Sequence, residues 1–271
     1  MKNVKDKICF IGGGNMGEAI IKGLVKQKLC EPKNVFLYEI DKTKHEKFKN
    51  LSINIVENAK DGIENADFVL LALKPNVIRG FLEENKDFLS GKIIISIAAS
   101  VPLSLICEVL GEQTPAVRIM PNTPMLVGKG AAAISVNENV SKKDFQYVCR
   151  LFSGISLLSV LEEESMNKVI SVNGSSPAYV YSFIRAMLKG AEEQGINEKQ
   201  ALPLILRTIE GAVRMVEKSD VSIDTLIDRV CSPGGTTLAA MKVLSEKGFE
   251  DIVSEAMNAC TKRADEITDE L

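Results

Sequence analysis

The sequence predicts an α/β protein in which a Rossmann-type doubly wound parallel sheet, residues 1–162, precedes an all-α domain, residues 163–271. Up to about residue 160, short apolar runs alternate with amphipathic stretches, the pattern of a parallel sheet covered by helices on both faces. After that point strand patterns stop and helical patterns continue to the end of the chain. A glycine-rich run joins the first apolar run to the first helical stretch, as in dinucleotide-binding folds.

Composition narrows the function classes. A chain of 271 residues with 45% apolar and 25% charged side chains is long enough for one large or two ordinary domains. The net charge of −3, with Lys and Arg scattered among Asp and Glu, argues against a nucleic-acid partner. No apolar run approaches the roughly 18 residues of a spanning helix, and no signal-peptide core follows the N-terminus. We therefore expect no membrane partner and a cytoplasmic location.

The six cysteines lie far apart and form no C-x-x-C pair. This spacing favours buried thiols in a reducing compartment over a metal site or a redox pair. We expect no bound metal.

The glycine-rich run begins where the apolar run Ile8–Ile11 stops. Gly12 allows a tight turn, Gly14 lets the backbone approach a pyrophosphate, and Gly17 lets the following helix pack close to the strand. Free N–H groups at the start of that helix would hold the phosphates. The alternative is a glycine-rich turn without a ligand, but the strand before the motif and the helix after it favour dinucleotide binding.

The next apolar run, Val35–Tyr38, ends at Glu39, about 20 residues past the motif as a Rossmann unit requires. A carboxylate there can accept hydrogen bonds from the ribose 2′-OH and repels a 2′-phosphate. Glu39 therefore favours NADH, while the nearby Lys42 and Lys44 leave NADPH open.

A charged helix containing His45, a short strand near residues 53–56 and a short helix come next. Phe68–Ala72 is almost wholly apolar, which suits the buried centre of the sheet. Pro75 cannot continue a strand, so Leu73-Lys74-Pro75 forms a turn at the carboxyl end of that strand, where open α/β sheets bind ligands.

The alternation continues with helix 77–88, strand 93–97, the small-residue turn 98–100, helix 102–110 and strand 116–119. Two prolines then fix the loop Met120–Pro124, which can line a nicotinamide pocket or serve as a plain structural turn. Strand 131–136, helix 141–152 and strand 156–160 complete the sheet.

The helical half opens at Asn173–Pro177, where serine caps a helix and proline occupies its first turn. The helix 178–194 carries apolar side chains on more than one face, and we expect a second subunit to cover them. A further helix, 197–218, starts with a capping box, and Asp220 lies in the loop behind it.

Val230–Thr237, VCSPGGTT, leads into another helix. Two glycines and two threonines at a helix N-terminus offer free N–H groups and hydroxyls together, which favours a carboxylate-binding site. The alternative is a structural cap, although a cap requires only one polar residue.

Four segments resemble pyrroline-5-carboxylate reductase, the last enzyme of proline synthesis: NGSSPAYVYSFIRAM, VCSPGGTT, the ALKP turn and IMPNTP. The resemblance runs from GGGNMG to the terminal helix. It implies reduction of the imine carbon of 1-pyrroline-5-carboxylate by NADPH or NADH. It also implies a homodimer, or a larger assembly of dimers, built by the helical domain, with the active site at the junction and partly across the dimer.

Carried over residue by residue, the resemblance assigns roles to matching positions. Cofactor contacts fall on Gly12, Gly14, Asn15, Met16, Gly17, Glu39, Asn58, Ala72, Leu73, Lys74, Ala98 and Ala99. Substrate contacts fall on Ser175, Ser176, Gly234, Gly235, Thr236 and Thr237. Thr237 and Asp220 are the implied catalytic residues, with Thr237 bonded to the ring nitrogen.

Three positions depart from the family pattern. Asn173 replaces a usual serine and Ser100 a usual glycine, both tolerable changes. Glu39 replaces a small polar or basic residue, which bears on the usual NADPH preference.

The chemistry fits the residues available. Carbonyl reduction requires a general acid, whereas an imine can be protonated before the hydride arrives. The one histidine, His45, lies among lysines and is expected to be an exposed helix residue. Two other functions stay open: a 3-hydroxyacid dehydrogenase with Lys168 as its acid, and a dinucleotide sensor without chemistry, which would have no use for VCSPGGTT.

Overall fold

The computed structural model describes residues 6–271, which form two compact units. One unit comprises the chain up to Pro177 together with Ala259–Leu271, and the other comprises Ala178–Asn258. The predicted boundary at residue 162 follows the last strand, whereas the compact units divide inside helices α7 (Ser176–Glu193) and α11 (Phe249–Asp269). The division into a nucleotide domain and a helical domain at residue 162 therefore stays a prediction.

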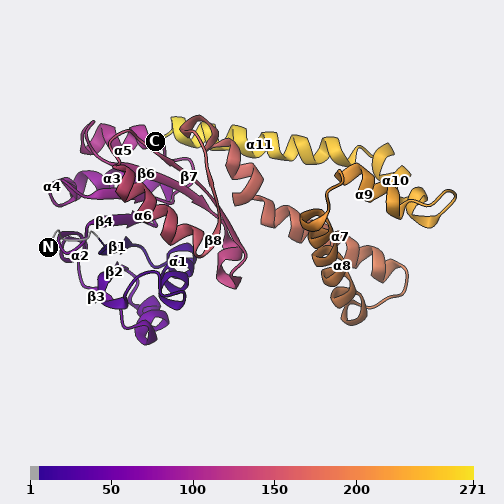
Figure 1. Ribbon diagram of the computed structural model, residues 1–271, viewed down its shortest axis with the longest axis horizontal. Helices are drawn as coiled ribbons and strands as arrows, with labels where there is room; N and C mark the ends of the chain where they lie inside the picture. Colours follow the sequence, from indigo (N-terminus) through magenta and orange to yellow (C-terminus); the bar gives the residue numbers. More distant parts are fainter. Residues whose placement is uncertain (1–5) are drawn as a thin grey trace. The chain divides into compact units, whose positions relative to one another are not determined.

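The first unit is built on one eight-stranded sheet with the order β3-β2-β1-β4-β5-β6-β7-β8 (Figure 1). Its strands are β1 (Ile8–Ile11), β2 (Val35–Tyr38), β3 (Asn54–Val56), β4 (Phe68–Leu71), β5 (Ile93–Ser96), β6 (Ala116–Pro121), β7 (Gly130–Val136) and β8 (Ser156–Val160). The order reverses beside β1, which places the glycine-rich turn at the switch point of a doubly wound sheet. The predicted Rossmann-type fold is confirmed.

One pair of strands departs from the parallel arrangement. β7 runs antiparallel to β6, with Val117 opposite Val136 and Pro121 opposite Ala132, while every other neighbouring pair is parallel. The connection is too short for a crossover, because only the 3₁₀ turn η3 (Thr123–Val127) lies between the two strands.

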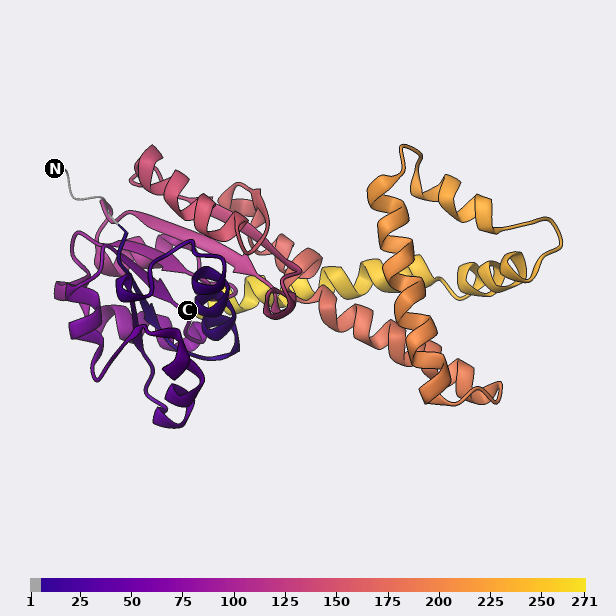
Figure 2. The same ribbon diagram turned by 60° about the horizontal axis from the view of Figure 1, so that its bottom comes forward.

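Alternate residues of the buried strands supply two separate cores. Phe10, Leu70 and Ile95 face α1 (Asn15–Lys26) and α6 (Lys142–Ser153). Cys9, Val69 and Ile94 face the opposite way, against four helices (Figures 1 and 2): α2 (Ala59–Glu64), α3 (Pro75–Glu84), α4 (Lys86–Leu89) and α5 (Leu103–Leu110). This is the period of two expected of strands covered on both faces.

Two predicted helices differ in detail. The predicted helix 77–88 is interrupted at Asn85, which is buried and donates its side-chain amide to the Phe81 carbonyl. The charged segment after β2 is a 3₁₀ helix, η2 (Lys42–Leu51). A second 3₁₀ helix, η1 (Pro32–Asn34), precedes β2.

The second unit is wholly helical. It holds most of α7, α8 (Glu198–Lys218), α9 (Ile223–Val230), α10 (Thr236–Glu246) and the start of α11. Among its described residues only Ala201 and Ile205 are buried apolar side chains. Large apolar side chains are exposed on all five helices, including Tyr181, Leu204, Ile223, Val243 and Ile252. Within residues 6–271 no helix has the length and apolarity to cross a bilayer.

Candidate functional site

Gly12 and Gly17 show the close packing predicted for them, and Gly14 lies beside open space. Gly12 has a φ of +105°, and a Cβ there would lie 2.6 Å from the Ala72 carbonyl oxygen. A Cβ on Gly17 would overlap the Gly12 carbonyl oxygen. A Cβ on Gly14, by contrast, would meet no atom within 4 Å. The first and third glycines therefore serve close packing, and the second leaves room in front of the turn.

Helix α1 begins directly after Gly14, whose backbone is extended. No side chain caps this end, so the N–H groups of Asn15, Met16 and Gly17 have no side-chain acceptor there. Asn15 is exposed, and Met16 packs against the core beneath the helix. Free N–H groups, the positive end of the helix dipole and the space at Gly14 fit a dinucleotide pyrophosphate.

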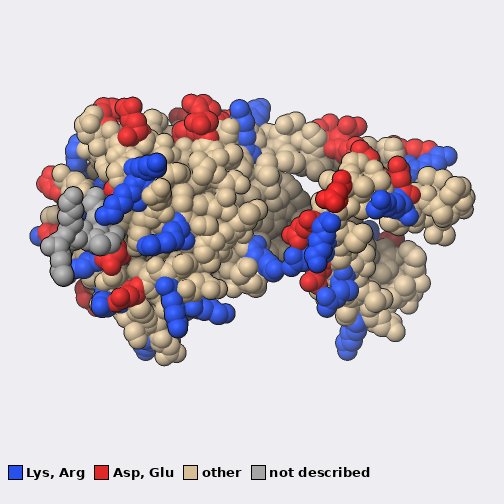
Figure 3. Space-filling view, viewed as in Figure 1, with Lys and Arg blue, Asp and Glu red and all other residues tan. Residues whose placement is uncertain are grey.

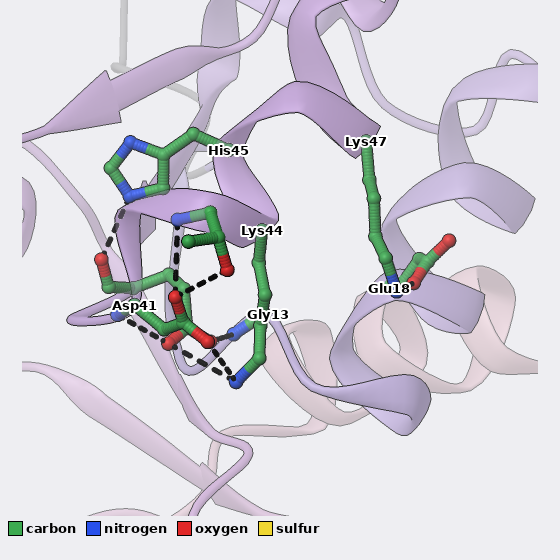
Figure 4. Close-up of polar contacts among 8 residues, drawn as sticks. Gly13, Glu18, Asp41, Lys44, His45 and Lys47 are labelled. Carbon is green, nitrogen blue, oxygen red and sulfur yellow. Dashed lines mark hydrogen bonds and ion pairs between the residues drawn. The ribbon is translucent and has the colours of Figure 1, made fainter.

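Glu39 at the end of β2 is buried, with 7% of its surface exposed. One carboxylate oxygen accepts the Gly13 N–H at 2.7 Å and the other accepts the Asp41 N–H at 2.9 Å. Lys44 Nζ lies 3.5 Å from Glu39 and 3.6 Å from Asp41 (Figure 4). Glu39 thus joins the end of β2 to the glycine loop by a hydrogen bond. It also lies at the position where the sequence predicts contact with the ribose.

The remaining polar groups around β2 are paired within the same unit. His45 Nε2 lies 2.8 Å from the Glu39 carbonyl oxygen, which fixes the imidazole on the backbone (Figure 4). Hydrogen bonds from Thr43 hold the pKa of Asp41 below its usual value. Glu18, in the first turn of α1, pairs with Lys22 and Lys47. Hydrogen bonds from these two lysines lower the pKa of its carboxyl group.

The other predicted cofactor residues follow strand ends at the same edge of the sheet. Ala72 donates its N–H to the Ile11 carbonyl and lies against Gly12 and Gly17. Leu73 is half-buried, and the exposed Lys74 precedes α3. Ala98 and Ala99 follow β5, the neighbour of β4.

Asn58 precedes α2 and uses its side chain locally. Its Oδ1 accepts the Asp61 N–H at 2.9 Å and its Nδ2 donates to the Asp61 carboxylate. In this structure Asn58 therefore acts as a helix cap.

Ser100, where the family usually has glycine, is buried and has a φ of +64°. Its carbonyl accepts the Thr268 hydroxyl at 2.8 Å. A left-handed conformation explains why glycine suits this position and why serine is a strained replacement.

Ser175 and Ser176 lie at the start of α7, behind a single π-helical turn, η5 (Ile170–Gly174). The Ser175 N–H bonds the Ile170 carbonyl at 2.8 Å and closes this turn. Ser175 Oγ lies 3.2 Å from the Cys260 sulfur. Such turns are frequent at functional sites.

The other predicted substrate residues belong to the second unit. Gly234 has a φ of +70° with open space around it, and the extended Gly235 directly precedes α10. No side chain caps α10, so the N–H groups of Thr236 and Thr237 have no side-chain acceptor at that end. Asp220 is exposed between α8 and α9. This helix start has the donors that a carboxylate requires.

The sequence predicts no functional role for two asparagines that are buried in the structure. Asn122, between β6 and η3, and Asn173, in η5, are each 8% exposed and hydrogen-bond across more than 40 residues of sequence. Sequence offered only a weak signal, since asparagine in a loop is an ordinary turn residue.

Charged side chains of both signs are interspersed on the face of the described residues that Figure 3 draws. In the described part of the chain no three His, Cys, Asp or Glu side chains gather as metal ligands.

The relatives of this protein align with almost the whole chain. A family model described as "Pyrroline-5-carboxylate reductase dimerisation" matches residues 163–267, and one described as "NADP oxidoreductase coenzyme F420-dependent" matches residues 7–100. The protein of Escherichia coli named pyrroline-5-carboxylate reductase is 36% identical over 98% of this chain and 99% of its own length. The Pseudomonas aeruginosa protein of that name is 33% identical over 98% of each chain.

Solved structures give the same match. The Plasmodium falciparum pyrroline carboxylate reductase with NADP bound superposes with a TM-score of 0.90 at 30% identity, covering 99% of each chain. The pyrroline-5-carboxylate reductase of Coxiella burnetii has a TM-score of 0.89 at 33% identity, covering 98% of this chain and 99% of that one. A Bacillus cereus imine reductase, at 16% identity and a TM-score of 0.53, shares the fold.

Proposed function

The chain belongs to the pyrroline-5-carboxylate reductase family, and we propose that it holds a nicotinamide dinucleotide on helix α1 and the acid group of its substrate on helix α10. As a member of this family it is an oxidoreductase that reduces the C=N bond of 1-pyrroline-5-carboxylate to give L-proline. The assignment of individual residues below is the proposed part.

The observation that carries the cofactor site is the space in front of Gly14. It lies at the uncapped start of α1, where the backbone supplies N–H donors and no side chain competes for them. NADH or NADPH bound there supplies the hydride. Ala72, Leu73, Lys74, Ala98 and Ala99, at the same edge of the sheet, would line the path toward the nicotinamide.

For cofactor choice we propose a preference for NADH. Glu39 and Asp41 place two carboxylates at the end of β2, and Lys44 is the one lysine ion-paired with both among the described residues. Lys42 is engaged by Glu57 at 2.9 Å. The remaining negative charge opposes a 2′-phosphate. Lys44→Ala should then raise the KM for NADPH more than the KM for NADH, and equal changes would contradict this assignment.

For the substrate we propose that the N–H groups of Thr236 and Thr237 bind the carboxylate, with the Thr237 hydroxyl directed to the ring nitrogen. The Gly235 N–H already bonds the Ser232 carbonyl at 2.9 Å. Gly234 supports this role, because its positive φ turns the chain and its missing side chain leaves the entrance open. Ser175 and Ser176 are further candidates for the acid group. Asp220 would stabilise the cationic imine. Its side chain is exposed, so its position is the least fixed among the proposed substrate residues.

The reaction requires little acid–base machinery. A protonated imine accepts hydride at carbon, and the ring nitrogen already carries its proton, so the product amine forms without a general acid. The bond of His45 to the Glu39 carbonyl supports a structural role for the one histidine. Catalysis then rests on orientation of the two reactants.

A homo-oligomer is supported by the dimerisation-family match and by the exposed apolar side chains of the helical unit. We propose a homodimer formed through these helices, because a second copy would cover surface that the unit itself leaves open. We further propose a cytoplasmic location, in keeping with six cysteines that form no disulfide in the described part of the chain.

The test is to mix the protein with 1-pyrroline-5-carboxylate and either NADH or NADPH and to follow the loss of nicotinamide absorbance. The proposal predicts turnover that survives Lys168→Ala. A 3-hydroxyacid dehydrogenase would lose activity in that variant, and a sensor would bind the nucleotide without turnover.

A further inference from the structure

Two asparagine side chains join the loop after β6 to the start of α7. Asn122 Nδ2 donates to the Asn173 carbonyl at 3.1 Å, and Asn122 Oδ1 accepts the Ala131 N–H at 2.9 Å. Asn173 Nδ2 donates to the Met120 carbonyl at 2.8 Å and to the Ala131 carbonyl at 3.2 Å. We call this set of four hydrogen bonds the asparagine clasp.

The clasp lies where the antiparallel pairing of β6 with β7 ends. Pro121 faces Ala132 in the last registered pair, so the same register would bring residue 122 opposite residue 131. Instead the two asparagine side chains satisfy both backbone groups of Ala131. The backbone of β6 is therefore free to leave the sheet and form the loop and η3 while its last neighbour stays fully bonded.

The π-helical turn η5 makes this arrangement possible. It presents Asn173 toward β6, with which η5 is in contact, and it is immediately followed by Ser175 and Ser176. Gly174 lies against the methyl group of Met120, because a Cβ there would overlap the Met120 Cε. The loop after β6 and the turn before α7 are thus packed directly on each other.

The loop also contacts the cofactor helix, because η3 packs against α1. A continuous chain of contacts runs from α1 through η3 and the clasp to the serines at the start of α7. Every member of it lies in the first compact unit. We propose that Asn122 and Asn173 are positioning residues, which hold the loop after β6, as a lining of the nicotinamide pocket, at a fixed distance from Ser175 and Ser176. This inference rests on the proposed function of these segments.

Asn173 Oδ1 is buried and accepts no hydrogen bond from the described residues, which offsets part of the free energy that its two donated bonds contribute.

The same ladder supplies a matched control at its other end. Asn137 Oδ1 accepts the Ala116 N–H at 3.1 Å, and its Nδ2 donates to the Thr114 carbonyl at 2.8 Å. Asn137 thus makes the same kinds of bonds at the edge of the sheet away from the glycine loop. A variant there removes a comparable set of hydrogen bonds without touching the loop or η5.

The experiment compares Asn122→Ala, Asn173→Ala and Asn137→Ala in the full-length protein. For each variant Tm, kcat, both KM values and the isotope effect with 4-deuterated reduced cofactor are measured. We expect kcat to fall at least 10-fold in the two clasp variants, with a larger isotope effect because hydride transfer becomes slower. The KM for the cofactor should change less than threefold, since α1 is intact. Asn137→Ala should lose Tm similarly and keep kcat within twofold.

Two milder variants apply if an alanine variant does not fold. Asn122→Asp keeps the acceptor for Ala131, and Asn173→Ser keeps one donor, so each should return part of the lost kcat. Clasp variants that fold and keep kcat within twofold of the wild type would overturn the positioning role. Wild-type turnover in the same assay tests the proposed function separately, since that function stands even if the clasp variants behave like Asn137→Ala.

Discussion

Gly14 and Gly17 lie three residues apart in one motif, yet the structure gives alanine opposite consequences at the two positions. At Gly17 a Cβ would overlap the Gly12 carbonyl oxygen, which belongs to the backbone of a tight turn and cannot rotate away. At Gly14 a Cβ would meet no atom within 4 Å, and the φ of −65° is one that alanine adopts freely. Gly17→Ala should therefore damage the fold, and Gly14→Ala should damage only binding.

The magnitudes follow from these contacts. Overpacking of this kind costs ~1–3 kcal/mol, and contact with backbone places Gly17→Ala near the upper value. At about 2–4 °C per kcal/mol for chains of this size, Tm should fall by roughly 6–12 °C. For Gly14→Ala, a poorer N-cap and a less flexible unfolded chain offset each other, so Tm should move by less than about 2 °C.

Cofactor affinity should change clearly in Gly14→Ala, whose Tm stays close to that of the wild type. A methyl group at Gly14 stands where the pyrophosphate must approach, so the Kd for NADH or NADPH should rise at least 10-fold, or about 1.4 kcal/mol. Calorimetric titration of folded Gly14→Ala, with thermal unfolding of both variants, measures these quantities. Wild-type affinity in Gly14→Ala would refute the assignment of this space to the cofactor, and an unchanged Tm in Gly17→Ala would refute the packing argument.

Three further predictions concern single side chains. Thr237→Ala should lower kcat/KM about 2- to 10-fold, the value of one neutral hydrogen bond at ~0.5–1.5 kcal/mol, with Tm unchanged; unaltered kinetics would remove the hydroxyl from the mechanism. Ser100→Gly should stabilise the protein by about 0.5 kcal/mol in denaturant unfolding, because relief of the left-handed strain exceeds the added flexibility of the unfolded chain, and the Thr268 bond to the backbone remains. Glu18→Gln tests pH dependence: the pKa of Glu18 is lowered in the folded protein, so its contribution to stability is present above its ordinary pKa of 4.5 and is lost as pH falls through the lowered value. The free energy of unfolding of the wild type should exceed that of this variant at neutral pH and equal it in acid. A difference in the free energy of unfolding that persists in strong acid would contradict the ion pairs with Lys22 and Lys47.

Much of the first unit was predictable because its signals are local. The alternation of apolar runs predicted the strands, and the glycine spacing predicted the close packing at Gly12 and Gly17; the structure confirms both. The predicted approach of a pyrophosphate to Gly14 stays a prediction. The antiparallel direction of β7 was not predictable from its apolar run, which is the same in either direction. The short link after β6 was the available signal, since parallel neighbours require a longer crossover.

The polar contacts were harder to predict because they depend on distant backbone. Sequence placed Glu39 correctly at the strand end, but a ribose hydroxyl and the Gly13 N–H are equally suitable donors, and only the folded loop shows that Gly13 bonds it. Asn122 and Asn173 meet across about 50 residues of sequence, and nothing in the spacing of either indicates the other. The exposed apolar surface of α7 was predictable because its apolar side chains occupy more than one face of the helix.

The account depends most on two helix N-termini, α1 for the dinucleotide and α10 for the acid group. A crystal structure with NADH and L-proline bound tests both directly. We expect the pyrophosphate against the amides of Gly14–Gly17 and the proline carboxylate against the amides of Thr236 and Thr237. A proline carboxylate bound elsewhere, with α10 unoccupied, would contradict the account.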